Sequence, residues 1–287
     1  MSLPARSLIL NLLLGAETPA SPALSVRELL AACALLGLSG NSLRVALARA
    51  VAAGLLVTPR RGWYALGPQA RPLADAVHRW RHITDTLVDW AGDWLAVHVG
   101  ASGRSDRSAL RARERAFGLL GLAEFERGLH LRPANLAGGA EHLRERLHAV
   151  VPAGTDTGTV FRLQGLSAAD TTRALGLWDG ERLNAAYLDT TARLSAWLDQ
   201  AAELPLDRAA REAFDIGHAA IRQLVFDPLL PAPLVDASAR ARFISTVQRF
   251  DDAGQALWRA FLAQARPAEP TVDPEPQPQP QIGRAHV

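Results

Sequence analysis

The chain has 287 residues, 48% of them hydrophobic, which is enough to bury two or three separate cores. All 31 basic residues are arginine, and they exceed the 29 acidic residues by only two, although the isoelectric point of the sequence is about 9.3. Cys33 is the only cysteine, so a disulfide within one chain is excluded.

The charge is distributed unevenly along the chain. Residues 1–82 hold nine arginines and three acidic residues, a net charge of +6, whereas residues 83–287 hold 22 arginines and 26 acidic residues, a net charge of −4. A basic first third predicts an N-terminal module that binds a polyanion such as DNA.

The sequence predicts neither a membrane span nor a secretory leader. The apolar run Leu29–Leu38 is too short to cross a bilayer. The N-terminal segment combines Arg6, an apolar stretch and small residues as a signal peptide does, but Asn11 interrupts the stretch, which favours the first helix of a small domain. We therefore expect a cytoplasmic protein that does not bind membranes.

The first 66 residues predict three helices and a hairpin. The second helix begins after Ser25, where Glu28 completes a capping box, and the third is capped by Ser39 or Asn41 and ends at Gly54. The other elements are a first helix over residues 4–15 and strands over residues 55–58 and 63–66. This order, with a short glycine-containing turn before the third helix, is typical of a winged helix-turn-helix.

A fourth helix is expected over about residues 70–90. Four of its side chains, His78, His82, Asp85 and Asp89, share a stripe at helical spacing. Such a row can bind a metal ion, but a solvated helix face is the favoured interpretation, and we expect neither a metal nor a cofactor.

The remaining chain predicts a mixed segment, a helical segment and a tail. Residues 83–175 follow a strand–helix–strand–strand–helix–strand order, which fits a ferredoxin-like domain. The next part is helical, with the prolines of residues 226–234 interrupting it. The predicted fold class is α+β, predominantly helical, with domains over residues 1–82, 83–175 and 176–264. Residues 265–287 form a proline-rich tail expected to be disordered, and its last six residues, IGRAHV, resemble translated sequencing adapter.

The third helix has a core face and a face of small residues. Leu43, Leu47 and Ala50 belong to the apolar stripe, whereas Val45 and Ala48 lie opposite. A narrow helix of this kind fits a major groove, with arginines at its borders and at the hairpin tip reaching bases or phosphates. The predicted DNA-binding residues are Asn41, Ser42, Arg44, Val45, Ala48, Arg49, Arg60 and Arg61.

Five segments in the same order resemble the PaaX family of phenylacetate-catabolism repressors. They are RSLILNLLLG (6–15), RVALARAVAAGLL with RRGWYAL (44–66), DWAGDWLAV (89–97), LHLRPANL (129–136) and HAAIRQLVFDPLLP (218–231). The resemblance implies a repressor that binds an inverted-repeat operator of double-stranded DNA as a homodimer. It also implies a Cas2-like middle domain and release by an aryl-CoA thioester such as phenylacetyl-CoA.

The chain departs from the family pattern at two places that bear on the effector. VDASAR stands where a tryptophan-glycine pair usually follows the Asp-Pro segment, and ERAFGLLGLAEF replaces a tryptophan-glycine-phenylalanine pattern in the middle domain.

Four residues are candidates for effector binding. His218 and Arg222 lie one helical turn apart, and an arginine can bind a phosphate of coenzyme A. Asp227 joins them as a candidate, although we favour a structural role in which it caps the proline-rich turn or pairs with Arg222. Trp94 is the fourth, as a wall of an aryl pocket or as part of the core.

The sequence predicts a DNA-binding regulator and not an enzyme. No nucleophile elbow, phosphate-binding glycine loop or zincin motif is present. Two alternatives stay open: a Cas2-like metal-dependent nuclease, for which Asp93 at the start of the first middle strand is the candidate, and a non-catalytic interaction scaffold.

Overall fold

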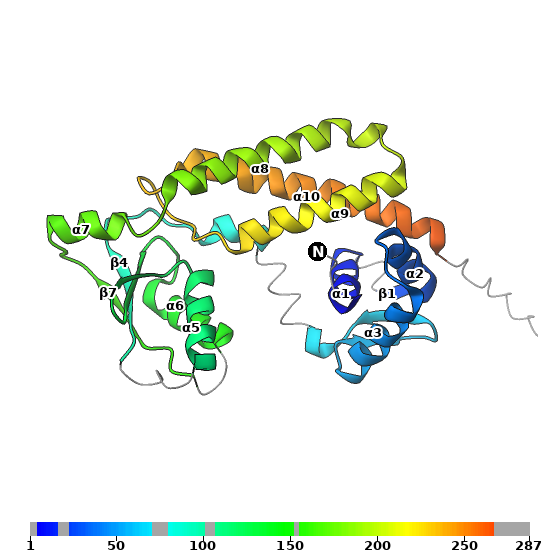
Figure 1. Cartoon of the computed structure of the whole chain (residues 1–287), viewed down its shortest axis with the longest axis horizontal. Helices are drawn as coiled ribbons and strands as arrows, with labels where there is room; N and C mark the ends of the chain where they lie inside the picture. The colour runs from blue at the N-terminus through cyan, green and yellow to red at the C-terminus, as the bar shows by residue number, and fades with distance from the viewer. Residues whose placement is uncertain (1–4, 17–22, 71–79, 101–106, 152–154, 267–287) are drawn as a thin grey trace, which may run out of the picture.

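The computed structural model describes residues 5–16, 23–70, 80–100, 107–151 and 155–266. The fold is α+β and mainly helical, with two small antiparallel sheets, which confirms the predicted class. Figure 1 shows the elements of the N-terminal part and those of the middle part on the same side of three long C-terminal helices.

The N-terminal part consists of three helices and a three-stranded antiparallel sheet of order β1-β3-β2. Its elements are α1 Ala5–Ala16, β1 Ala23–Ser25, α2 Val26–Leu35, α3 Gly40–Ala52, β2 Leu56–Val57 and β3 Trp63–Leu66. The three helices and the hairpin match the prediction. Strand β1 was not predicted, because three residues are too few to show a period and its partner β3 lies about forty positions away.

Local sequence signals set the ends of α2. The Ser25 hydroxyl accepts a hydrogen bond from the Glu28 amide at 3.2 Å, and the Glu28 carboxylate accepts one from the Ser25 amide at 2.7 Å. Gly37, with φ of +75°, reverses the chain at the other end, where the Leu38 amide donates to the Cys33 carbonyl at 2.7 Å. The turn to α3 is therefore encoded within a few residues.

One apolar core joins the three N-terminal helices to the end of the chain. Leu8 and Ile9 of α1, Leu29 of α2 and Leu43 of α3 are all buried in it. Leu262 belongs to the same core although it lies more than two hundred residues downstream. The N-terminal part therefore packs against the last helix as well as within itself.

The helix predicted over residues 70–90 is wrong beyond Arg81. Residues 71–79, which include His78, lie outside the described residues, and the short 3-10 helix η2 Ile83–Thr86 follows. From Leu87 the chain is extended, because Leu87 pairs with Leu136 and the Val88 amide donates to the Asn135 carbonyl at 2.9 Å.

The predicted stripe of possible metal ligands is not on one helix. His82 contacts Asp85 at 3.2 Å, whereas Asp89 lies in the extended segment after η2. Among the described residues, no group of three or more His, Cys, Asp or Glu side chains could hold a metal ion.

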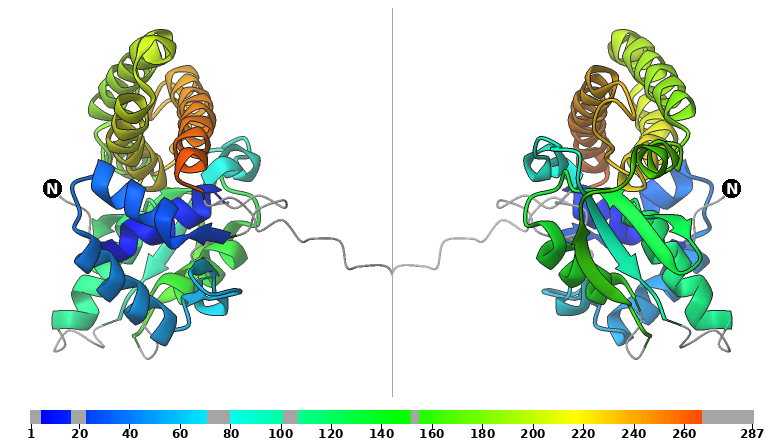
Figure 2. Two further views of the ribbon diagram at one scale, coloured as in Figure 1. Left: turned by 90° about the vertical axis from the view of Figure 1, so that its right-hand side faces the viewer. Right: turned by 90° about the vertical axis from the view of Figure 1, so that its left-hand side faces the viewer.

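The middle part has the predicted alternation of strands and helices. Its elements are β4 Trp94–His98, α5 Arg107–Leu119, β5 Ala123–Glu126, β6 Leu129–Pro133, α6 Gly139–Val150 and β7 Thr159–Leu163. The sheet is antiparallel throughout, in the order β5-β6-β4-β7. Leu95 and Val97 of β4 face α5 and α6, whereas Trp94 and Ala96 face the opposite side. The right-hand view of Figure 2 shows this sheet, drawn in teal and green, in front of the N-terminal part.

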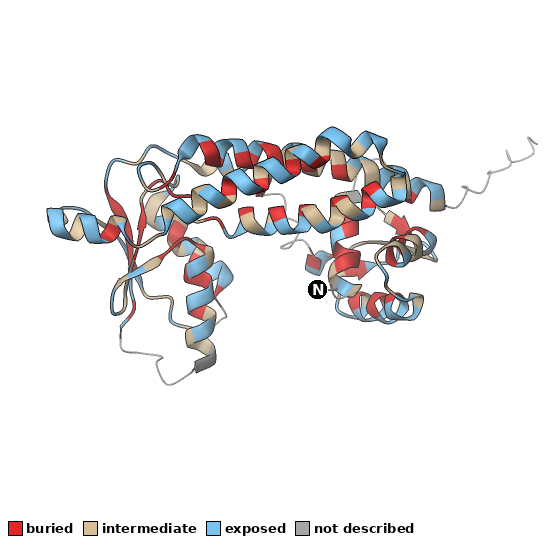
Figure 3. Ribbon diagram, turned by 45° about the horizontal axis from the view of Figure 1, so that its top comes forward, coloured by how far each residue is buried: buried red, intermediate tan, exposed pale blue. Residues whose placement is uncertain are grey.

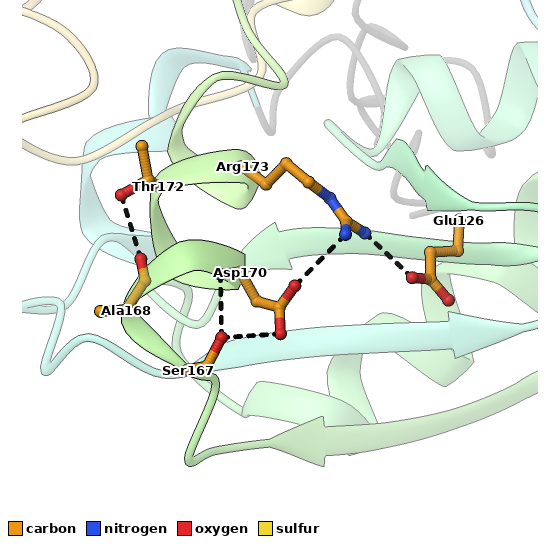
Figure 4. A network of polar contacts seen from close by, with 6 residues as sticks. All are labelled: Glu126, Ser167, Ala168, Asp170, Thr172 and Arg173. Atoms are coloured by element: carbon orange, nitrogen blue, oxygen red, sulfur yellow. Dashed lines mark hydrogen bonds and ion pairs between the residues drawn. The ribbon is translucent and has the colours of Figure 1, made fainter.

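Helix α7, Ala168–Leu175, covers the second face of this sheet and was not predicted. The Ser167 hydroxyl accepts a hydrogen bond from the Asp170 amide at 3.1 Å and so caps the helix. Arg173 bridges Asp170 at 3.3 Å and Glu126 of β5 at 3.0 Å (Figure 4). Its guanidinium also lies over the Phe125 ring at 4.1 Å, so one side chain attaches α7 to the sheet.

The C-terminal part is a bundle of three long helices, α8 Gly180–Gln200, α9 Leu206–Val225 and α10 Ala237–Ala265. The proline-rich segment interrupts it between α9 and α10, as predicted. Buried residues recur along all three helices between exposed ones (Figure 3). No helix in the described ranges is long and apolar enough to cross a bilayer.

Candidate nucleic-acid interface and interdomain sites

Helix α3 presents an uncovered face of the predicted composition. Its inner residues Leu43, Leu47 and Ala50 are buried in the N-terminal core. Val45 on the outer side is 43% exposed, so the outer face of α3 carries an apolar side chain in contact with solvent. All six predicted DNA-binding residues of this helix are exposed: Asn41, Ser42, Arg44, Val45, Ala48 and Arg49.

The two remaining predicted DNA-binding residues, Arg60 and Arg61, lie exposed in the turn between β2 and β3. The Arg60 guanidinium lies 3.7 Å from the centre of the Trp63 ring. Arg266, just after α10, approaches the same ring at 5.8 Å. Cation–π contacts of this kind hold the arginine stem in place while its charge stays available at the surface.

The local charge of this face is entirely positive. Residues 39–67, which span α3 and the hairpin, contain four arginines and no acidic residue. The structure therefore places a helix with small outward side chains next to a basic turn, and this arrangement suits a polyanion.

The four effector candidates do not form one site. His218 and Arg222 are exposed on α9, whereas Asp227 is buried after the end of that helix. Trp94 is buried in the middle sheet, where its ring stacks on that of Trp178 with centroids 6.1 Å apart. The structure therefore places Trp94 in a core of its own and keeps Asp227 from solvent.

Asp227 holds the proline-rich turn, in line with the structural role favoured above. Its carboxylate accepts a hydrogen bond from the Leu229 amide at 2.7 Å. Burial raises the pKa of Asp227, and the Tyr187 hydroxyl, the Leu229 amide and the Arg240 guanidinium oppose that rise. The pairing with Arg222 is not observed, since the Arg222 guanidinium lies over the Phe226 ring at 5.7 Å.

Arg132 and Asn135 were missed as functional positions, although both lie in the LHLRPANL segment quoted above. Arg132 is buried and donates to the Leu120 carbonyl and, at 3.4 Å, to the Pro228 carbonyl. The Asn135 side chain donates to the Leu229 carbonyl at 2.6 Å. Burial lowers the pKa of Arg132 to about 10. Two segments about ninety residues apart in sequence therefore meet, and they join the middle sheet to the C-terminal bundle.

A pocket of about 200 Å³ lies between α1, α9 and α10. Four aromatic side chains line it: Trp80, Phe214, Phe250 and Trp258. His218 is at its wall, so this effector candidate lies beside the pocket, whereas Arg222 does not line it. No sequence pattern indicated this pocket, because its walls come from four separate segments: α1, residues 80–81, α9 and α10.

Family models match both ends of the chain. A model described as PaaX-like protein matches residues 4–70, and one described as PaaX-like protein C-terminal domain matches residues 178–260. Together the two models cover just over half of the sequence. The chain belongs to the PaaX family.

In this PaaX family protein the two matched regions correspond to the part that carries α3 and to the helices α8, α9 and α10. The chain is also similar to the solved structure of an uncharacterized protein, Rv0674, from Mycobacterium tuberculosis. The identity is 28% and the TM-score 0.56, over 88% of this chain and 100% of that chain. A search of curated proteins finds no match.

The residue named for nuclease chemistry is already engaged in an ion pair. Asp93 is buried directly before β4, and its carboxylate pairs with the Arg162 guanidinium on the neighbouring strand β7. A buried carboxylate held by an arginine is poorly placed to bind a metal ion in open contact with a nucleic acid. The geometry of Asp93 therefore gives no support to the nuclease alternative.

Proposed function

We propose that this PaaX family protein is a transcriptional repressor that binds double-stranded operator DNA through α3 and the β2–β3 hairpin. Family membership supports a role in regulating phenylacetate catabolism. The observation that carries the proposal is the outer face of α3, which exposes Val45 and Ala48 between Arg44 and Arg49. Binding of DNA in a major groove would cover this face and remove its apolar groups from water.

In this proposal residues 1–82 form a winged helix-turn-helix with α3 as its recognition helix. Arg44 and Arg49 reach base edges or phosphates at the groove borders, and Asn41 and Ser42 contact the DNA near the start of the helix. Arg60 and Arg61 in the hairpin turn reach a neighbouring phosphate run or the minor groove.

The rest of the chain arranges two recognition helices on an inverted repeat. Residues 83–175 form a ferredoxin-like, Cas2-like domain that acts as a dimerising spacer, and the sheet order β5-β6-β4-β7 supports this assignment. Residues 176–264 form the helical C-terminal domain. The tail expected over residues 265–287 lies outside the described residues from residue 267 on, whereas Ala265 still belongs to α10 and Arg266 pairs with Glu28. The protein works as a homodimer in the cytoplasm, and an inverted repeat matches its two-fold symmetry.

The proposed signal that releases the DNA is an aryl-CoA thioester such as phenylacetyl-CoA. His218 is the effector candidate that the structure supports best, because it borders the aromatic pocket. Arg222 is exposed on the same helix and is available to a phosphate of coenzyme A. Asp227 and Trp94 act indirectly, through the proline-rich turn and the middle core.

The test is a titration of the protein with its own upstream DNA, monitored by fluorescence anisotropy. The double variant Arg44→Ala/Arg60→Ala should lose most of the affinity and flatten the dependence of the affinity on salt, because it removes phosphate or base contacts. Arg193→Ala, an exposed arginine on α8, serves as the control and should bind like the native protein.

Two results would contradict the proposal. One is no binding of the native protein to its upstream DNA at low salt. The other is equal affinity of the native protein and the Arg44/Arg60 double variant, with both shown to be dimers by light scattering. Release of bound DNA by phenylacetyl-CoA, but not by coenzyme A alone, is the expected response to the effector.

A further inference from the structure

Trp63, the first residue of β3, lies at the base of the hairpin turn that carries Arg60 and Arg61. Its amide donates a hydrogen bond to the Arg60 carbonyl at 3.0 Å, which closes the turn, and its ring centre lies 3.7 Å from the Arg60 guanidinium. The Trp63 side chain is half-buried, so part of it packs on the protein. The direction in which the Arg60 side chain leaves the turn therefore depends on where the Trp63 ring is held.

The base of the hairpin also contacts the beginning of α2. Strand β1 places Ser25 opposite Trp63, and the Val26 amide donates to the Gly62 carbonyl at 2.8 Å. Ser25 is the N-cap of α2, and Glu28 completes its capping box. The hairpin turn, the first turn of α2 and the buried Glu28 carboxylate therefore lie together.

Arg266 reaches this place from the other end of the chain. It follows α10 directly, and its amide donates to the Ala263 carbonyl at 3.3 Å, so the last turn of the helix fixes its backbone. Its Nε donates to the Glu28 carboxylate at 2.9 Å, and its guanidinium carbon lies 5.8 Å from the centre of the Trp63 ring. The end of α10 therefore contacts both the cap of α2 and the ring that supports Arg60.

The two arginines at the Trp63 ring differ in how their charge is used. The charge of Arg266 is offset by Glu28, whose side chain is fully buried, whereas the Arg266 side chain is 38% exposed. This pairing reduces both the repulsion between Arg266 and Arg60 and the attraction of Arg266 for a phosphate. Arg60 is exposed and forms no ion pair within the described part of the chain, so its charge is available to DNA.

We propose that Arg266 is a positioning residue for DNA binding, which holds the Trp63 ring and through it the direction of Arg60. The hairpin then responds to the position of α10 directly, and not only through the N-terminal core. A movement of the C-terminal helices that withdraws Arg266 frees the ring and weakens the contact of Arg60 with DNA. The inference rests on the proposed function for that DNA contact, but not for the link between Arg266 and the hairpin.

A double-mutant cycle on DNA affinity tests this role. Arg266→Gln should weaken binding of the full chain to its upstream DNA about fivefold, because it removes the cation from the Trp63 ring. In the Arg60→Ala background the same change should have almost no effect, since no guanidinium is left for the ring to direct. Arg242→Gln, which replaces an exposed arginine near the start of α10, is the matched control and should bind like the native chain.

The dependence of the affinity on salt separates positioning from direct contact. Loss of one phosphate contact lowers the slope of log affinity against log salt concentration by about one, and Arg60→Ala should show this change. The double variant Arg60→Ala/Arg266→Gln should keep the slope of Arg60→Ala. A further fall of about one in the double variant would show that Arg266 itself contacts a phosphate, and it would overturn the proposal.

Hydrogen–deuterium exchange of the DNA-free protein tests the link between α10 and the hairpin. In Arg266→Gln the amides of residues 55–66 should exchange about fivefold faster than in the native chain, because the contact that holds the Trp63 ring is lost. Arg242→Gln should leave the exchange of these amides unchanged. Native exchange of the hairpin in Arg266→Gln would overturn the proposal.

The two measurements separate this inference from the repressor proposal. If the hairpin exchanges faster in Arg266→Gln but the native chain does not bind its upstream DNA, the repressor proposal fails and the link between α10 and the hairpin stands. If the native chain binds DNA and Arg266→Gln weakens binding equally in the native and Arg60→Ala backgrounds, the repressor proposal stands and the positioning role of Arg266 is refuted.

Discussion

The buried carboxylate of Glu28 links the DNA-binding part to the end of the chain, and its removal should loosen α2. Its side chain is fully buried, and it accepts one hydrogen bond from the Ser25 amide at 2.7 Å. It accepts a second from the Arg266 guanidinium at 2.9 Å. One carboxylate therefore completes the cap of α2 and holds the residue that follows α10.

Glu28→Ala should cost about 2 kcal/mol of local stability. Loss of the hydrogen bond from the Ser25 amide costs about 1 kcal/mol, whereas the Ser25 hydroxyl still accepts from the amide of residue 28. Loss of the ion pair adds about 1 kcal/mol rather than the 3–5 kcal/mol of a fully buried pair, because the Arg266 side chain is 38% exposed and its charge is hydrated after the change. At about 1.4 kcal/mol per tenfold, α2 amides should exchange hydrogen about thirtyfold faster.

Hydrogen–deuterium exchange read by mass spectrometry measures this effect peptide by peptide. Arg266→Gln removes the ion pair alone and keeps an amide that can donate to the carboxylate, so it should give roughly half of the change in free energy. Ser25→Ala removes the hydroxyl that accepts from the Glu28 amide but keeps the Ser25 amide, so both contacts of the Glu28 carboxylate remain and Arg266 should stay attached. Peptides of α7, in the middle part, serve as the internal control and should not change. Exchange of α2 within threefold of the native rate in Glu28→Ala would show that the carboxylate does not hold the two elements together.

Three further outcomes follow from buried groups. Burial raises the pKa of Asp227 above its unfolded value of about 3.9, so its contribution to stability is present at low pH and is lost as the pH rises through the folded pKa. Between pH 4 and pH 7 the melting temperature of Asp227→Asn should therefore fall less than that of the native chain. Parallel curves of melting temperature against pH for the two proteins would contradict this. Arg132→Met leaves buried carbonyls of Leu120 and Pro228 unpaired and should lower the free energy of unfolding in urea by about 2 kcal/mol; an unchanged midpoint would refute the role of this arginine. Cys33 is buried and burial raises the pKa of its thiol, so iodoacetamide should label it at pH 8 only after unfolding; equal labelling with and without urea would contradict its burial.

The features predicted correctly from the sequence depend on neighbouring residues. The capping box of Ser25 and Glu28 spans three positions, and the two faces of α3 follow from a helical period over thirteen residues. The apolar side of α3 is fixed by its own spacing whatever it packs against, so its exposed side can be identified as well.

The features that were missed or wrong depend on distant residues. Strand β1 exists because β3 pairs with it, and the helix expected to reach residue 90 gives way because Leu87 pairs with Leu136. The effector candidates on α9 were grouped by sequence spacing, but the chain turns after Val225 and places Asp227 inside the bundle. The structure of these segments is decided by contacts with residues that are distant in the sequence. The spacing of neighbouring residues gives no information on such contacts.

Helix α10 is the element through which the three parts of the chain are connected. Near its start, Arg240 donates to the Leu230 carbonyl in the proline-rich turn that the middle part also holds through Arg132. Farther along, Trp258 lines the pocket, and Leu262 enters the N-terminal core. Because a single continuous helix carries these contacts, a displacement at the pocket cannot be absorbed by a loop before it reaches the N-terminal core. If the proposed effector binds at the pocket, α10 gives it a short and continuous path to the packing under α3.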